Sequence, residues 1–141
     1  MANIIAAEFK KYFAGLASTH EVCAALGTTL SASSNLFIGI EPSNEIATRC
    51  LTLIPYPGAP PSPEGDRQES NVQIRLKIPD SEAGWKTMQS IINDLHGNED
   101  VCASCHGRVS AVQSSPILLE IQEGGEFYIF VSNYSVKHTK L

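Results

Sequence analysis

The second half of the chain carries two strand patterns with a helix pattern between them. Residues 71–78 alternate apolar and polar side chains, which is the period of a strand with one buried face. Asp80 and Ser81 can cap a helix over about 82–96, and Gly97 supplies the residue that ends it. After a loop, residues 126–136 have the composition of a long strand. This order favours a fold in which a helix packs against a sheet.

The helix pattern over 82–96 has one apolar face. Four large side chains recur at three- and four-residue steps and are predicted to pack on the sheet: Trp85, Met88, Ile92 and Leu95. Gly84 lies early in this helix, where a glycine costs about 1 kcal/mol relative to alanine. Close packing against a neighbouring element is the interpretation that we give to this glycine.

The remainder of the chain supplies further helix and strand patterns. An amphipathic helix is predicted over about 3–16, with a short helical continuation over 21–26. Strand patterns occur at four other places: 35–40, 47–54, 108–112 and 116–121. The order predicts an α+β fold in which a mostly antiparallel, mixed β-sheet is packed by the N-terminal helix and by the central helix at about 82–96. We expect a single domain over residues 1–141.

One tract is rich in proline and glycine. Residues 57–70 contain four prolines and two glycines, a composition that disfavours helix and ladder hydrogen bonds. We therefore predict a flexible loop at about 56–70 that joins two strands and orders when it meets a partner protein. The residues assigned to this interaction loop are Tyr56, Pro57, Gly58, Pro60, Pro61, Pro63, Glu64, Asp66 and Arg67.

A second motif, Cys102-x-x-Cys105-His106, could hold a metal. It has the form that attaches c-type haem, with two thioether bonds and a histidine on the iron. Zinc is a second interpretation, although a structural site needs four Cys or His ligands and the motif offers three. A thioredoxin-type redox pair is a third, but such a pair should follow a strand and open a helix, whereas this one follows a helix and Gly97. We expect no export signal and a cytoplasmic protein, where thiols stay reduced. The interpretation that we favour is a reduced pair in a surface loop.

Charge and the other motifs argue against several functions. Ten Lys and Arg stand against fifteen Asp and Glu, a formal net charge of −5. Proteins that wrap DNA need a dense basic surface. The sequence has no phosphate-binding glycine loop, dinucleotide fingerprint or nucleophile elbow, and no apolar stretch long enough to cross a membrane. We expect no catalytic residues, no cofactor and no membrane partner.

Four segments, taken in order, resemble one family. They are 36–42 (Leu-Phe-Ile-Gly-Ile-Glu-Pro), 72–76 (Val-Gln-Ile-Arg-Leu), 91–97 (Ile-Ile-Asn-Asp-Leu-His-Gly) and 127–136 (Phe-Tyr-Ile-Phe-Val-Ser-Asn-Tyr-Ser-Val). Their order and spacing over about residues 35–138 resemble the tail terminator proteins of long-tailed bacteriophages, which are minor capsid, head–tail joining proteins. The Cys102-x-x-Cys105-His106 motif is not part of that pattern.

The resemblance implies a structural role in the virion. It implies a small tail-terminator-like α+β protomer that assembles into a hexameric ring in the tail or neck, within the host cytoplasm. The ring would stop elongation of the tail tube and join the tail to the head connector protein. Its partners would be other copies of the chain, the tail tube protein and the connector, with phage DNA passing through the lumen without specific binding. The family offers no catalytic residues to carry over.

Overall fold

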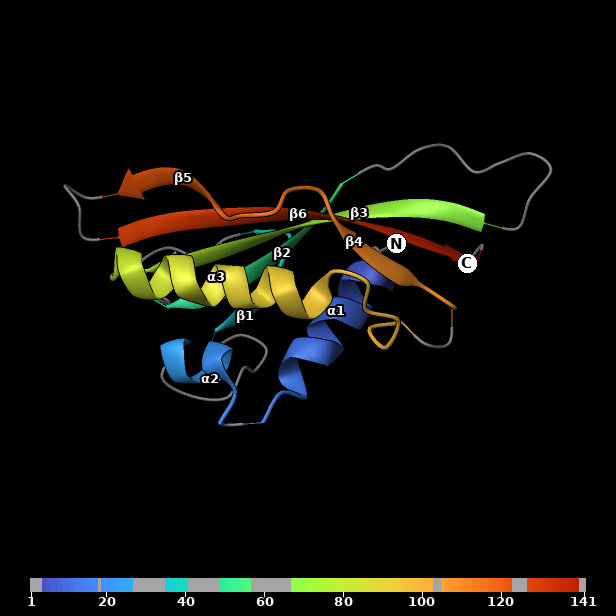
Figure 1. The fold of residues 1–141 in the computed structure, drawn as a ribbon, viewed down its shortest axis with the longest axis horizontal. Helices are drawn as coiled ribbons and strands as arrows, with labels where there is room; N and C mark the ends of the chain where they lie inside the picture. Colours follow the sequence, from blue (N-terminus) through green and yellow to red (C-terminus); the bar gives the residue numbers. More distant parts are fainter. Residues whose placement is uncertain are drawn as a thin grey trace.

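The computed structural model of the protein describes residues 4–17, 19–26, 35–40, 49–56, 67–102, 105–122 and 127–139. Its helices are α1 (Ile4–Ala14), α2 (Glu21–Leu26) and α3 (Ser81–Leu95). Its strands are β1 (Leu36–Ile38), β2 (Cys50–Tyr56), β3 (Arg67–Ile78), β4 (Arg108–Ala111), β5 (Ile117–Gln122) and β6 (Phe127–Thr139). Figure 1 shows the helices gathered on one side of the sheet.

The sheet is mixed but mostly antiparallel, which confirms the predicted α+β fold. Its order is β1-β2-β3-β6-β4, and β5 also pairs with β6. Only the β1–β2 pair is parallel among the described strands. β3 and β6 pair along nearly their whole length, from Arg67 opposite Thr139 to Ile78 opposite Tyr128. Because β3 occupies one edge of β6, β4 and β5 lie one after the other along its second edge.

The core lies between this sheet and the helices. Four apolar residues of β3 at steps of two are buried, as the period-2 pattern predicts: Val72, Ile74, Leu76 and Ile78. Lys77 on the other face is buried as well. α1 contributes Ile5, Phe9 and Phe13, and the Phe9 ring lies 6.3 Å from the Tyr134 ring of β6. An aliphatic or aromatic side chain buried in this way stabilises the fold by about 1.5–3 kcal/mol.

α3 begins and ends as its sequence predicts, within one residue. The Asp80 carboxylate accepts hydrogen bonds from the backbone amides of Glu82 (3.0 Å) and Ala83 (3.2 Å), so it caps two free donors. Gly97 follows the helix with a φ of 80°, a conformation that costs other residues free energy. The capping assignments are therefore confirmed.

The face that α3 presents to the sheet differs from the prediction at one residue. Met88, Ile92 and Leu95 are buried as expected, but Trp85 is 47% exposed. Gly84 is buried in its place, and a Cβ at Gly84 would lie 2.6 Å from side-chain atoms of both Ile78 and Phe130. The glycine lets the helix approach the sheet closely. That approach rotates the large indole of the next residue out of the interface.

Strand ends also differ from the predicted bounds. β3 begins at Arg67 rather than at residue 71, because residues 67–70 pair with the C-terminal end of β6. β2 extends to Tyr56, opposite Asn71 of β3. The predicted loop is therefore shorter than 56–70, and residues 57–66 lie outside the described residues. No helix within the described ranges is long and apolar enough to cross a membrane.

Candidate functional site

The most unusual surface of the described protein is strand β5. Four aliphatic side chains, Ile117, Leu118, Leu119 and Ile121, are between 43% and 55% exposed. Among the described strands β5 pairs only with β6, so it forms an edge of the sheet. Proteins normally protect such edges with charges, prolines or a covering element, because an exposed edge strand can pair with another chain. An apolar edge of this kind indicates a contact surface.

A β-bulge spreads the apolar side chains of β5 over both faces of the sheet. Ile117 lies opposite Val131, Leu118 opposite Phe130, and the register then shifts by one residue at Leu119. Phe130 is on the helix side of the sheet, since it meets Gly84, so Ile117 and Leu118 project to opposite faces. Bulges at sheet edges re-aim side chains in this way.

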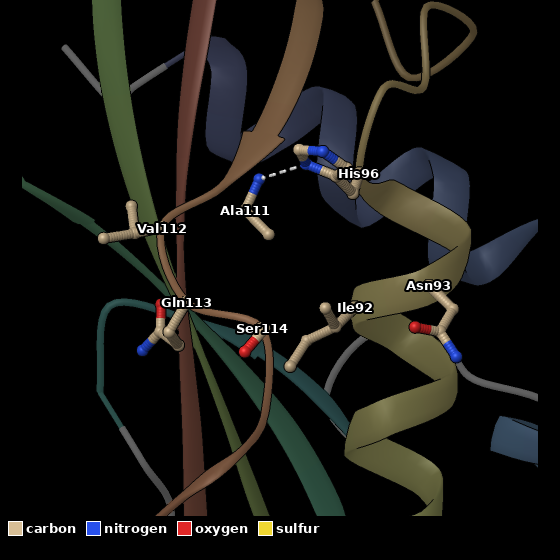
Figure 2. Close-up of a pocket in the computed structure, with 7 residues that line it drawn as sticks. All are labelled: Ile92, Asn93, His96, Ala111, Val112, Gln113 and Ser114. Carbon is tan, nitrogen blue, oxygen red and sulfur yellow. Dashed lines mark hydrogen bonds between the residues drawn. The ribbon is translucent and has the colours of Figure 1, made fainter.

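The segment that joins β4 to β5 continues this surface and borders a pocket. Val112 is 64% exposed. The pocket has a volume of about 400 Å³ and lies between α3 and this segment (Figure 2). Its lining residues are Ile92, Asn93, His96, Ala111, Val112, Gln113 and Ser114. No lining side chain is a carboxylate or an amine, so the pocket suits an apolar or amide group of a partner.

Hydrogen bonds hold the wall of this pocket in place. His96 Nδ1 accepts from the Ala111 amide at 3.0 Å, as drawn in Figure 2. Gln89 Nε2 donates to the Ser114 carbonyl at 3.1 Å, and the Asn133 amide donates to Gln113 Oε1 at 3.2 Å. These bonds tie the connection to both α3 and β6. The start of β5 is therefore a pre-formed surface.

The cysteine motif differs from its predicted state. Cys102 and Cys105 are joined by a disulfide, and both are buried. The expectation of free thiols in a surface loop is therefore wrong on both counts. The bonded sulfurs act as a cross-link, and a haem or zinc site on Cys102, Cys105 and His106 would first need that bond reduced. Within the described residues no group of three or more metal-ligating side chains gathers.

The cysteine loop is fastened to the end of β6. The Thr139 amide and the Thr139 hydroxyl both donate to the Cys105 carbonyl at 3.0 Å. The Gly107 amide donates to the Cys102 carbonyl at 3.0 Å. His106 is exposed, whereas Cys102 and Cys105 are buried, and its φ of 51° places its backbone in the left-handed region. These hydrogen bonds hold the loop at the end of β6, where Cys102 and Cys105 are part of the buried core.

The predicted interaction loop can be followed only at its two ends. Tyr56 is the last residue of β2 and Arg67 the first of β3. Burial, and secondly the negative charge of Glu69, raise the pKa of the Tyr56 hydroxyl. The other assigned residues, Pro57, Gly58, Pro60, Pro61, Pro63, Glu64 and Asp66, lie outside the described residues.

The sheet face that these two strand ends share is polar. Gln73 Nε2 donates to Asn133 Oδ1 at 3.0 Å, and together with Ile54 and Tyr56 they line a shallow hollow of about 390 Å³. Ser135 donates to the Glu69 carboxylate on the same face. The polar positions of the alternating strand 71–78 are the sequence signal of this face, which was not predicted as a surface.

The exposure of β5 was likewise missed. The sequence predicted a strand at 116–121, and the strand is confirmed as Ile117–Gln122. The available signal was the run Ile117-Leu118-Leu119, in which apolar residues follow one another without alternation. Such a run is typical of a strand buried on both faces, which an edge strand becomes only when a partner covers it.

Comparison with known proteins relates the chain to one family of known description. A family model described as bacteriophage tail terminator protein matches residues 20–140, a range that runs from the start of α2 through β6. A search of curated proteins found no relative.

Proposed function

Because the chain belongs to the bacteriophage tail terminator family, we propose that its copies form a hexameric ring on the end of the tail tube. The ring stops tube elongation and offers its opposite face to the head connector protein. The protein acts as a structural component of the virion, in the tail or neck, and catalyses no reaction. The observation that carries the proposal is the family match over residues 20–140.

The surface of the described residues supports an assembly role. β5 exposes aliphatic side chains along an edge of the sheet. It pairs with β6, which is itself paired with β3 along nearly its whole length. A rigid sheet with an apolar edge suits a protein that functions by fixed contacts with neighbours.

The tube protein and the DNA are assigned to different parts of the ring. The residues between Tyr56 and Arg67 contact the tube protein, because a proline-rich connection between two long strands can reach beyond the sheet and order on a partner. DNA passes through the lumen without specific binding. The net charge of −5 is compatible with this, since a protein that binds DNA tightly needs a dense basic surface.

Tube growth in vitro tests the proposal. Purified tube protein of the same phage is polymerised with and without this protein, and tube lengths are measured by electron microscopy. We expect shorter tubes whose ends carry a ring-shaped cap of extra density. Unchanged tube lengths, with no density at the ends, would contradict the proposal.

A further inference from the structure

In a reducing cytoplasm, where we expect the chain to be made, the Cys102–Cys105 pair would carry two thiols rather than the disulfide of this structure. We propose that the pair is a redox latch, which is open while the chain folds and assembles and which closes as a disulfide after the virion leaves the host. The inference rests on the proposed function, because a virion protein passes from a reducing to an oxidising environment. It gives a role to a motif that the family resemblance does not explain.

The main-chain hydrogen bonds of the cysteine loop do not depend on the sulfurs. The Gly107 amide donates to the Cys102 carbonyl, and the amide and hydroxyl of Thr139 both donate to the Cys105 carbonyl. None of these bonds uses a sulfur atom, so they persist when the disulfide is reduced. The chain can therefore reach the same fold with two thiols.

The reduced pair also fits the loop. Cys105 Sγ lies 3.4 Å from the Cys102 carbonyl oxygen, within hydrogen-bond range of a thiol donor. Both cysteines belong to the apolar core, where a reduced cysteine behaves as a small hydrophobic residue. Cys23 and Cys50 show that this core accepts thiols, since both are buried and neither forms a disulfide. Both oxidation states are therefore compatible with the fold.

The packing around the sulfurs makes a change of state slow. Cys102 is 3% exposed and Cys105 is 5% exposed. A Cβ at Gly107 would lie 3.2 Å from Cys105 Sγ and 3.3 Å from Val136 Cγ1, so a single added carbon would already crowd this sulfur. Thiol–disulfide exchange passes through a mixed disulfide, which is far larger than one carbon. The exchange therefore requires local opening of the loop, and a closed latch persists between such openings.

Closing the latch requires a small-molecule disulfide, such as oxidised glutathione. One cysteine thiolate attacks this molecule, forms a mixed disulfide with half of it and releases the other half as a thiol. The second cysteine thiolate then attacks the protein-bound sulfur and releases the remaining half. The two protein thiols lose two electrons and two protons in total, and one small-molecule disulfide becomes two thiols. An excess of the small thiol drives the same steps backwards.

The latch acts on the end of the strand that organises the sheet. The Cys105 carbonyl binds Thr139, the last residue of β6, and β3, β4 and β5 all pair with β6. Strand ends open locally more often than strand centres. Because the disulfide restricts Cys105 relative to Cys102, it should reduce the opening of this end of β6. The latch therefore makes the finished particle more durable without being required for folding.

A redox titration with a local readout tests the inference. The protein is equilibrated with reduced and oxidised glutathione, its thiols are alkylated after denaturation, and the modified residues are identified by mass spectrometry. Cys102 and Cys105 should be alkylated when reduced glutathione is in about 100-fold excess and protected in oxidised glutathione. Cys23 and Cys50 should be alkylated in both buffers and serve as internal controls.

Hydrogen exchange of the Thr139 amide reports the effect on β6. We expect exchange to be about 10-fold slower in the oxidised protein than in the reduced protein. The variant that combines Cys102→Ser with Cys105→Ser is the control, and its exchange should be the same in both buffers. Equal exchange in the two states of the wild type would overturn the inference, because the disulfide would not hold this end of the strand.

The other outcomes are equally distinct. A pair that stays oxidised in excess reduced glutathione is a permanent cross-link, and a pair that stays reduced in oxidised glutathione never closes; either result overturns the inference. The reduced protein should shorten tail tubes as well as the oxidised protein does. Activity of the oxidised protein alone would overturn the latch and leave the proposed function standing. A protein that titrates as expected but shortens no tubes in either state contradicts the proposed function alone, because the titration involves no tubes.

Discussion

Gly84 of α3 lies so close to Phe130 of β6 that a Cβ at the glycine would stand 2.6 Å from Phe130 Cε2. We therefore expect Gly84→Ala to destabilise the protein. The alanine gains about 1 kcal/mol of helix propensity, but overpacking a rigid core costs about 1–3 kcal/mol, and a second clash with Ile78 adds to it. Urea unfolding should show a net loss of about 1–2 kcal/mol. Lys86→Ala, at an exposed site of the same helix, is the control and should change stability by less than about 0.5 kcal/mol.

The cap at the start of α3 gives a second prediction. Asp80→Ala removes the acceptor of the Glu82 and Ala83 amides and should cost about 1 kcal/mol of unfolding free energy. Asp80→Asn keeps an acceptor oxygen at this position and should lower the unfolding free energy by only a few tenths of about 1 kcal/mol. The two variants are compared by urea unfolding at neutral pH. An equal loss in both would mean that the carboxylate charge matters more than the hydrogen bonds.

The buried hydroxyl of Tyr134 predicts a loss of stability in strong base. Burial raises the pKa of Tyr134 above its ordinary value, and the Ser132 hydroxyl, 2.9 Å away, only partly opposes this. The folded protein therefore keeps the proton at a pH where the unfolded chain releases it. This stabilisation is complete below about pH 10 and decreases above it, by up to about 1.4 kcal/mol per pH unit.

Tyr134→Phe provides the control for this pH dependence. The variant cannot ionise at residue 134, so its stability should fall less steeply between pH 9 and pH 11 than that of the wild type. Tyr12 and Tyr56 also have raised pKa values and contribute to the slope in both proteins. The difference between the two slopes therefore isolates Tyr134. Parallel slopes would contradict the assignment.

The disulfide predicts a modest effect of reduction. Cys102 and Cys105 are three residues apart, and closing so short a loop restricts the unfolded chain by only about 1–2 kcal/mol. We expect Cys102→Ser combined with Cys105→Ser to fold, with a stability lowered by about this amount. Wild-type protein in reductant should behave in the same way. Stoichiometric zinc in the reduced protein would instead show that the thiols are ligands.

Removing the proline-rich connection separates folding from assembly. We predict that replacing residues 57–66 by a glycine–serine linker long enough to reach from Tyr56 to Arg67 leaves the unfolding transition unchanged, since the β2–β3 pairing ends at Tyr56 and Asn71. The same variant should fail to shorten tail tubes. A deletion protein that caps tubes as well as the wild type would show that the connection does not contact the tube protein.

The elements with an unambiguous period could be predicted from the sequence. The alternation of 71–78 and the capped pattern of 82–96 give β3 and α3 because a single buried face fixes the side-chain period. Trp85 shows the limit of that reasoning. Its spacing to Met88 fits the apolar face, but the small volume of Gly84 decides which side of the helix touches the sheet, and that depends on Phe130 across the interface.

The candidate site was harder to predict, for a related reason. An apolar run such as Ile117-Leu118-Leu119 predicts a strand but does not say whether its partner belongs to the same chain. The state of Cys102 and Cys105 depends on their being brought together in a closed turn beneath β6, which spacing alone does not determine. The state of the cysteines depends on contacts between the loop and β6, which is distant in sequence. The exposure of β5 depends on its having no covering element among the described residues.

Strand β6 also sets a fixed distance within the molecule. Its thirteen residues span about 40 Å. β5 pairs with the first half of β6, and the cysteine loop is hydrogen-bonded to its last residue. A backbone held on both sides by neighbouring strands can neither stretch nor shorten appreciably. The spacing between β5 and the cysteine loop is therefore constant, because both are attached to the same paired strand.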